Sequence, residues 1–266
     1  IQNLKMIQPT LNIPLYELAS EENVELIHTK SLEVLSQVGM DFYLPEALQI
    51  LRDHGVRVEG ETAFFEPEQI EEYISKAPSH FTQLARNPEN NLVIGGNSVV
   101  FAPMYGPPFV YDSVRGRREA TLQDFQNFVK LAYLSPHIHH SGGTIVEPTD
   151  EPTGTRHLDM LYSHIKYSDK AFMGSVMSGA NARDSVKMAE ILFGEEKIRQ
   201  DPALISLINI SSPRRLDDRM LEALTVYARA RQATIITPFI LSGAMAPVSI
   251  PGTLIQQNAE ALAGIA

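Results

Sequence analysis

The pattern most suggestive of chemistry is a histidine cluster, His137-Ile-His-His140. If this segment is a strand, His137 and His139 share one face and His140 points to the other. Two imidazoles on one face could begin a zinc or iron site, which His157 or Asp159 would complete. The cluster lies at the amino end of its predicted strand, whereas parallel α/β folds keep their sites at the carboxyl ends. We therefore expect no bound metal, and a metal-dependent enzyme stays an alternative.

Two weaker signals accompany that cluster. His157 and His164 are seven residues apart on a predicted helix and share a face, a spacing more typical of a surface than of a ligand set. The arginines of Arg115-Gly-Arg-Arg118 offer positive charge to a phosphate, but no glycine-rich loop accompanies them and they open no strand–helix unit. We expect these arginines to form charge pairs with Asp112, Glu119 or Asp124.

Composition removes several classes of function. The 266 residues contain no cysteine, which excludes disulfides, thiolate metal sites, iron–sulfur clusters and a cysteine nucleophile, and fits a cytoplasmic location. The net charge of -10 disfavours nonspecific nucleic-acid binding. The stretch from Gln232 to Ala259 has no charged residue, as a membrane-spanning helix would, but prolines and glycines interrupt it. A buried strand, a polar loop and a new helix explain the same residues.

The elements that must position any site alternate between strand and helix in the second half of the chain. Strand-like runs are Ile138–Glu147, Ala171–Ser178, Ala203–Ser211 and Thr234–Leu241, and helix-like runs lie near Leu158–Lys166, Ala182–Phe193, Asp217–Arg231 and from Thr253 onward. This alternation predicts parallel strands joined by crossover helices. Four such units in residues 137–266 match the first half of an eight-unit (β/α)8 TIM barrel. We therefore expect an α/β fold with a barrel that is incomplete in this chain.

The first half of the chain has a different organisation. Residues 1–90 predict a helical layer, in which Ser20, Pro45 and Pro67 begin three amphipathic helices. Residues 91–136 predict a β-hairpin insert and a linking helix. Within this insert, Leu92–Ile94 would pair with Ser98–Phe101 and Phe109–Asp112 with Arg117–Ala120, after which Thr121 caps a helix with Asp124 three residues on.

Several segments together resemble the trimethylamine methyltransferase family of corrinoid-dependent methylamine and betaine methyltransferases. They are Ile27-His28, Leu35–Gly39, Ala77-Pro78, Ala85–Pro88, Ile94–Gly96, Gly106–Pro108, Asp112, Gly116–Arg118 with Thr121 and Asp124, Ala246–Val248, and Gln257–Gly264. Each segment is weak alone, but they occur in this order over essentially the whole chain. The resemblance is therefore fairly specific.

The resemblance implies a TIM barrel with an N-terminal helical extension. It also implies transfer of a methyl group from a methylated amine, such as trimethylamine or glycine betaine, to the cobalt of a separate corrinoid protein. This chain would then bind no cofactor directly, would meet a cognate corrinoid protein, and is expected to form a homo-oligomer. Family members are longer, and the pyrrolysine of the trimethylamine branch would fall beyond Ala266. A truncated, non-catalytic binding or assembly fragment is therefore a second hypothesis.

Such chemistry needs groups that hold a cation lacking N–H donors, namely aromatic faces and carboxylates. In a barrel these groups belong at the carboxyl ends of the strands. The candidates at predicted strand ends are Glu147, Ser178, Asn209, Ser211, Phe239 and Ser242, and Tyr105 and Phe109 of the insert would lie over the barrel mouth. Each has a simpler explanation, such as hairpin packing for the two insert rings or backbone satisfaction for the strand-end groups. No residue is assigned a catalytic role.

Overall fold

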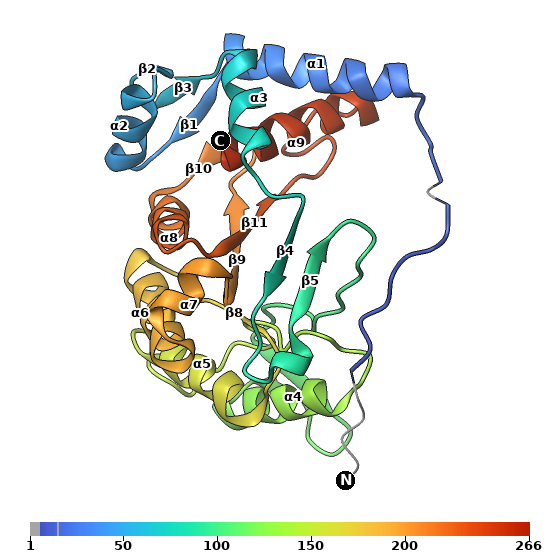
Figure 1. Ribbon diagram of the computed structural model, residues 1–266, viewed down its shortest axis with the longest axis vertical. Coiled ribbons are helices and arrows are strands. Elements are labelled where there is room, and N and C mark those ends of the chain that lie inside the picture. Colours follow the sequence, from blue (N-terminus) through green and yellow to red (C-terminus); the bar gives the residue numbers. More distant parts are fainter. Residues whose placement is uncertain (1–5, 15) are drawn as a thin grey trace. The chain divides into compact units, whose positions relative to one another are not determined.

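The computed structural model describes residues 6–14 and 16–266, and it has a mixed α/β architecture (Figure 1). The chain divides into two compact units, each described here by itself. Unit 1 contains the described residues up to Asn12 together with Ser79–Ser206 and Val226–Thr234. Unit 2 contains the described residues of Ile13–Pro78 together with Leu207–Thr225 and Ile235–Ala266.

The N-terminal part of unit 2 confirms the three expected helices and adds strands that the sequence did not predict. Its elements are α1 (Glu21–Gln37), β1 (Met40–Phe42), α2 (Pro45–Asp53), β2 (Arg57–Glu59), β3 (Thr62–Phe64) and α3 (Pro67–Ser75). The side chain of Ser20 caps α1 by accepting from the Asn23 N–H at 3.3 Å. The strands were missed because each has only three residues, too few to show an alternating pattern.

The rest of unit 2 builds on these elements. Strand β10 (Arg215–Leu216) pairs in parallel with β1, in a sheet with the order β10-β1-β3-β2. Helix α9 (Ile250–Ile265) runs beside α1 (Figure 1), where the buried Ser31 hydroxyl donates to the Ile255 carbonyl at 3.0 Å. Gly264 gives α9 close contact with a strand, because a Cβ there would lie 2.6 Å from Cγ2 of Ile236.

A second sheet contains β8 (Phe172–Met173), β9 (Leu204–Ile210) and β11 (Ala233–Pro238), in the order β11-β9-β8. Strands β8 and β9 are parallel, as expected. The predicted strands Ala171–Ser178, Ala203–Ser211 and Thr234–Leu241 therefore each contain an observed strand. Strand β9 has apolar residues on both faces, interrupted by Ser206 and Asn209, and burial of most of its residues on both faces explains this pattern.

The expected strand at Ile138–Glu147 is wrong. No strand is assigned there, although the Ser141 N–H donates to the Ala171 carbonyl at 2.8 Å and the Met173 N–H to the Gly142 carbonyl at 2.9 Å. The ladder does not continue because Gly142 has a φ of +91° and the Gly142 N–H donates instead to Nδ1 of His140. The segment thus keeps two backbone hydrogen bonds to residues 171 and 173, while the His140 side chain accepts from the Gly142 N–H in place of a continued ladder.

One of the two predicted hairpins is also wrong. Strand β5 (Leu92–Gly95) pairs antiparallel with β4 (His80–Gln83), whereas Ser98–Phe101 forms no strand and the Val99 N–H donates to the Pro9 carbonyl. A Cβ at Gly95 would lie 2.1 Å from the Ser79 carbonyl oxygen, so this glycine permits the close approach of β4. The second hairpin is confirmed, with β6 (Phe109–Asp112) antiparallel to β7 (Gly116–Glu119).

The predicted linking helix of residues 91–136 and the predicted helices of the second half are confirmed in order. They are α4 (Leu122–Leu134), α5 (Arg156–Tyr167), α6 (Gly179–Phe193), α8 (Asp218–Arg229) and α9, with a short α7 (Glu195–Gln200) and a 3-10 turn η1 (Pro88–Asn90) in addition. Helix α4 buries Phe125, Val129 and Ala132, the apolar face that its sequence spacing indicates. Among the described residues, no helix has the length and apolar character that crossing a lipid bilayer requires.

Candidate functional site

In unit 1, Tyr105 lies beside Gly143 and Met173, at the carboxyl end of β8. A Cβ built on Gly143 would lie 2.9 Å from Cε2 of Tyr105 and 2.9 Å from Cβ of Met173. The loop that carries Tyr105 is fixed by backbone bonds, in which the Gly106 N–H donates to the Thr144 carbonyl at 2.6 Å and the Glu147 N–H to the Pro107 carbonyl at 2.9 Å. The Tyr105 side chain stays 41% exposed. Tyr105 therefore lies on a fixed loop and keeps an accessible ring surface.

The segment under this ring is held by buried neutral histidines. His164 of α5 lies 2.7 Å (Nδ1) from the Ser141 hydroxyl and 2.9 Å (Nε2) from the Gly143 carbonyl oxygen. Burial lowers the pKa of His164 to about 4 and that of His140 to about 3. His164 is therefore neutral at pH 7, so that its Nε2–H donates to Gly143 and its Nδ1 accepts from Ser141.

The histidine cluster does not assemble as the sequence suggested. His137 is exposed and His139 is buried, so the two do not share a face. The His139 Nδ1 accepts from the Phe101 N–H at 3.0 Å, and Nε2 of His157 lies 2.8 Å from a carboxylate oxygen of Asp184. Within residues 6–14 and 16–266, no three His, Asp or Glu side chains are grouped to hold a metal ion. The expected surface location of His157 and His164 is wrong, because both are buried.

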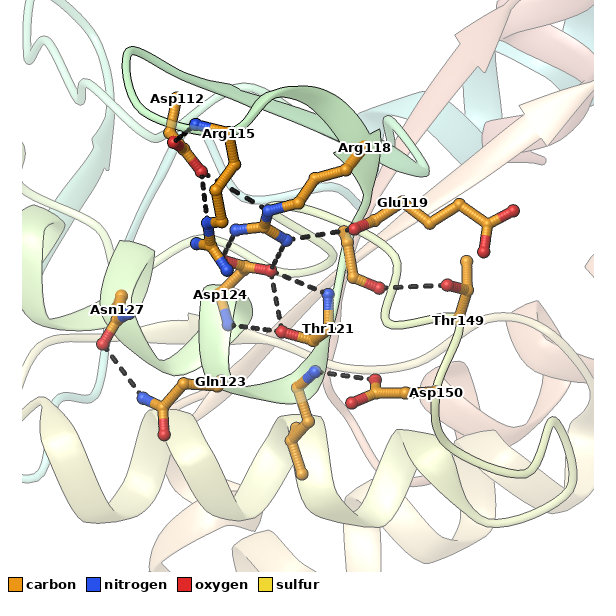
Figure 2. A network of polar contacts seen from close by, with 12 residues as sticks. Asp112, Arg115, Arg118, Glu119, Thr121, Gln123, Asp124, Asn127, Thr149 and Asp150 are labelled. Atoms are coloured by element: carbon orange, nitrogen blue, oxygen red, sulfur yellow. Dashed lines mark hydrogen bonds and ion pairs between the residues drawn. The ribbon is translucent and has the colours of Figure 1, made fainter.

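The arginine cluster forms charge pairs, as expected (Figure 2). The guanidinium of Arg118 contacts both carboxylate oxygens of Asp124, at 2.5 and 2.6 Å, while Arg115 pairs with Asp112 at 3.0 Å. The Arg118 contact holds the pKa of the Asp124 carboxyl well below its usual range. Thr121 and Asp124 complete the predicted capping box of α4. The network joins the β6–β7 hairpin to the start of α4, so its arginines already have anionic partners.

The other candidates of unit 1 have structural partners. The guanidinium carbon of Arg117 lies 3.8 Å from the ring centroid of Phe109, so it covers one face of that ring. The Glu147 carboxylate pairs with Arg156, and the Ser178 hydroxyl caps α6 by accepting from the Asn181 N–H at 3.2 Å. Their role in binding substrate stays a prediction. Tyr105 and Phe109 are similarly exposed, and the Arg117 contact is what distinguishes Phe109 from Tyr105.

The candidates of unit 2 lie at or just after the carboxyl ends of β9 and β11. The Thr237 hydroxyl donates to the Asn209 side-chain oxygen at 2.8 Å, across the two strands. Phe239 follows β11 and is 66% exposed, while the hydroxyl of Ser242 lies 2.8 Å from that of Thr253 on α9. The side chain of Ser211 is exposed. These residues offer an aromatic surface and neutral polar groups, and their roles also stay predictions.

Two buried groups were missed by the sequence analysis. Glu260 of α9 accepts from the Ser212 hydroxyl at 2.5 Å and from the Arg214 N–H at 2.8 Å, which fixes the loop after β9. Tyr227 of α8 donates its hydroxyl to the Ser175 carbonyl at 2.5 Å, and burial raises its pKa to about 12. A lone glutamate in the apolar final helix was an available signal for Glu260, whereas the sequence contains no comparable signal for Tyr227.

Comparison with known proteins gives concordant matches. The family model described as trimethylamine methyltransferase matches residues 1–266. A glycine betaine methyltransferase of Desulfitobacterium hafniense (strain Y51) is 48% identical over 254 residues, which are 95% of this chain and 53% of that protein. A trimethylamine methyltransferase of Desulfitobacterium hafniense (strain DSM 10664 / DCB-2) is 28% identical over 92% of this chain and 50% of its own length.

A third relative is named for a different betaine. The proline betaine:corrinoid methyltransferase of Eubacterium limosum is 26% identical over 92% of this chain and 52% of its own length. The chain thus spans about half the length of the curated relatives that it matches. Because the family model covers every residue and the likeness to the Y51 protein is high, the chain belongs to the trimethylamine methyltransferase family.

Proposed function

We propose that this chain is part of a methyltransferase that takes a methyl group from a methylated amine and passes it to the cobalt of a cognate corrinoid protein. Glycine betaine is the favoured donor. The single observation that carries this choice is the 48% identity, over 95% of the chain, to a glycine betaine methyltransferase. The identity to the trimethylamine enzyme is 28%. The corrinoid acceptor is favoured by the name of the proline betaine relative.

The exposed side chains fit such a donor. A quaternary ammonium has no N–H to donate, so it is bound by aromatic faces that together exclude water. Within unit 1, Tyr105 is exposed near the carboxyl end of β8 and is one proposed aromatic contact. Within unit 2, Phe239 is exposed just after β11 and is a second candidate, considered by itself. The remaining predicted contacts are Phe109, Glu147, Ser178, Asn209, Ser211 and Ser242. The corrinoid stays with the partner protein in this proposal, and homo-oligomerisation remains part of it.

The same proposal includes a (β/α)8 barrel. The alternation β8–α6–β9–α8–β11–α9 and the parallel pairing of β8 with β9 support this architecture. Residues 137–266 would supply its first half, with residues 1–90 as an N-terminal layer and residues 91–136 as an insert. The irregular segment 138–147 would take the position of the first strand, since it bonds to the edge of β8.

The test mixes the complete gene product with a reduced corrinoid protein encoded beside it and a single methyl donor. In the expected reaction the N–CH3 bond would break with its electron pair left on nitrogen, and the Co(I) of the reduced corrinoid protein would supply the pair for the new Co–CH3 bond and become Co(III). Glycine betaine should yield dimethylglycine, followed by NMR, with one cobalt methylated per donor consumed.

Three outcomes decide among the alternatives. Dimethylglycine formation that requires the corrinoid protein supports the proposal. Faster turnover of trimethylamine than of glycine betaine would instead favour the trimethylamine branch of the family. If no methylated amine reacts, yet the protein binds the corrinoid partner, the non-catalytic assembly role is supported instead. Activity that a chelator abolishes and zinc restores would favour the metal-dependent alternative.

A further inference from the structure

We propose that Gly143 and His164 are positioning residues that set the ring of Tyr105 as the cation-binding face of unit 1. This inference rests on the proposed function and adds to it the parts of the chain that orient the ring. Neither Gly143 nor His164 is among the substrate-binding residues predicted from the sequence. The argument begins at Gly143, where the ring makes its closest approach.

Gly143 is required for space rather than for backbone conformation. Unlike Gly142, whose φ is +91°, Gly143 does not have the positive φ that favours glycine. An alanine could therefore adopt its backbone geometry. The alanine Cβ, however, would lie 2.9 Å from Cε2 of Tyr105 and 2.9 Å from Cβ of Met173. Since Met173 is anchored in β8, the tyrosine ring is the group that must move.

His164 holds Gly143 in this position. Its Nε2–H donates to the Gly143 carbonyl at 2.9 Å, and its Nδ1 accepts from Ser141 at 2.7 Å. The imidazole itself is locked between Phe125, whose ring centroid is 5.2 Å away in an edge contact, and Phe172, stacked at 6.1 Å. Because His164 is 1% exposed, it cannot contact the substrate, and any effect on binding must act through the segment that it holds.

Tyr105 is the ring of unit 1 best placed to meet a cation. Its loop is tied down by the bond from the Gly106 N–H to the Thr144 carbonyl at 2.6 Å, and its side chain remains 41% exposed. Phe109 has comparable exposure, but the Arg117 guanidinium covers one of its faces at 3.8 Å. A quaternary ammonium approaching Phe109 would also meet the positive charge of Arg117. Substitution of Tyr105 should therefore weaken binding of the cation more than substitution of Phe109.

The experiment measures glycine betaine binding to the complete gene product by calorimetry, which needs no corrinoid partner. Gly143→Ala should weaken binding about 3- to 30-fold, the range for losing one well-placed aromatic contact. The matched control is Gly154→Ala, because that glycine has open space around its Cβ position and no positive φ. Tyr105→Leu should weaken binding to the same degree as Gly143→Ala, and Phe109→Leu should weaken it less.

A double variant separates positioning from general destabilisation. If Gly143 acts through the ring, adding Gly143→Ala to Tyr105→Leu should cause no further loss. His164→Gln should weaken binding in the wild-type background and have no added effect in the Tyr105→Leu background. Additive losses, or normal binding by Gly143→Ala or Tyr105→Leu, would overturn the inference while leaving the methyltransferase proposal intact. A wild-type protein that binds no methylated amine would overturn both.

Discussion

Two regions of unit 1 are held by side-chain contacts, one by charged groups and the other by neutral groups. The first is a charged clamp, defined here as Asp112, Arg115, Arg118, Thr121 and Asp124 (Figure 2), whose ion pairs lie at or near the surface. The second is a neutral clamp, defined as His140, Ser141 and His164, which is buried and carries no charge at pH 7. The charged clamp connects the β6–β7 hairpin to α4, and the neutral clamp connects an irregular segment to α5.

The difference shows how each kind of clamp responds to its surroundings. Charges at the surface keep most of their hydration, so their pairing adds little net stability and salt screens it. Neutral groups in the core have no water to return to, so each broken hydrogen bond leaves an unsatisfied polar atom. The neutral clamp should therefore dominate local stability and respond to pH, while the charged clamp mainly sets geometry.

The largest expected effect comes from His164→Ala. The substitution leaves the Ser141 hydroxyl and the Gly143 carbonyl without partners and opens a cavity between Phe125 and Phe172. The combined cost should be about 3–5 kcal/mol of unfolding free energy. Urea denaturation measures the total, and hydrogen exchange of peptides spanning residues 139–147 locates it. His137→Ala is the control, since that side chain is exposed, and an equal loss there would refute the comparison.

The next effect is acid destabilisation through the neutral clamp. The pKa of His164 is about 4 in the folded chain against an ordinary value of 6.5, so between these values the unfolded state binds more protons. The free energy of unfolding therefore keeps its full value above pH 6.5 and decreases as the pH drops toward 4. The decrease due to this group is about 3 kcal/mol. His140 adds a loss of the same sign that continues to about pH 3.

Urea midpoints from pH 7.5 to 4.5 test this window. The pKa values of Asp112 and Asp124 are lowered, so their contribution disappears only below the ordinary carboxyl range and does not interfere. The variant His164→Gln should reduce the slope of stability against pH and leave the part due to His140, because glutamine does not titrate. A slope unchanged by this variant would assign the acid sensitivity to other groups.

Within the charged clamp, Thr121→Ala should have a smaller effect. The Thr121 hydroxyl accepts from the Asp124 N–H at 3.3 Å and caps α4, and loss of such a cap costs about 1 kcal/mol. Thr121→Ser is the matched control, since serine keeps the hydroxyl and should retain nearly all of the stability. Equal losses for both variants would mean that the methyl group, rather than the cap, stabilises the start of the helix.

The two clamps also differ in how far the sequence predicts them. The charged clamp was predicted because its residues lie within thirteen positions of one another, so that Thr121 and Asp124 reveal a capping box by their spacing alone. The neutral clamp joins Ser141 to a histidine 23 residues away, a pairing that only the packing of α5 creates. The apolar run through Ile145 and Val146 therefore indicated a strand, although Gly142 turns the backbone out of a ladder.

The same reasoning explains the candidate site. The sequence predicts where β9 and β11 end, and hence where Asn209 and Phe239 lie, because apolar runs identify buried strands. It does not predict that Arg117 covers Phe109 or that Tyr105 lies against Gly143, because these contacts depend on hairpin twist and loop path. For these site residues, the sequence predicts their position along the strands but not the side chains that surround them.

The smallest expected effect is that of Arg115→Met. Arg115 pairs with Asp112 at 3.0 Å, but its side chain is 64% exposed, so water replaces the lost contact at little cost. The variant should unfold at the same urea concentration as the wild type, within experimental error, at both 0.05 and 1 M NaCl. Arg118→Met is the informative partner, because it removes the two-pronged contact with the less exposed Asp124 and should give a measurable loss that shrinks in high salt. If Arg115→Met lost more unfolding free energy than Arg118→Met, side-chain exposure would not explain which ion pairs of the charged clamp stabilise the fold.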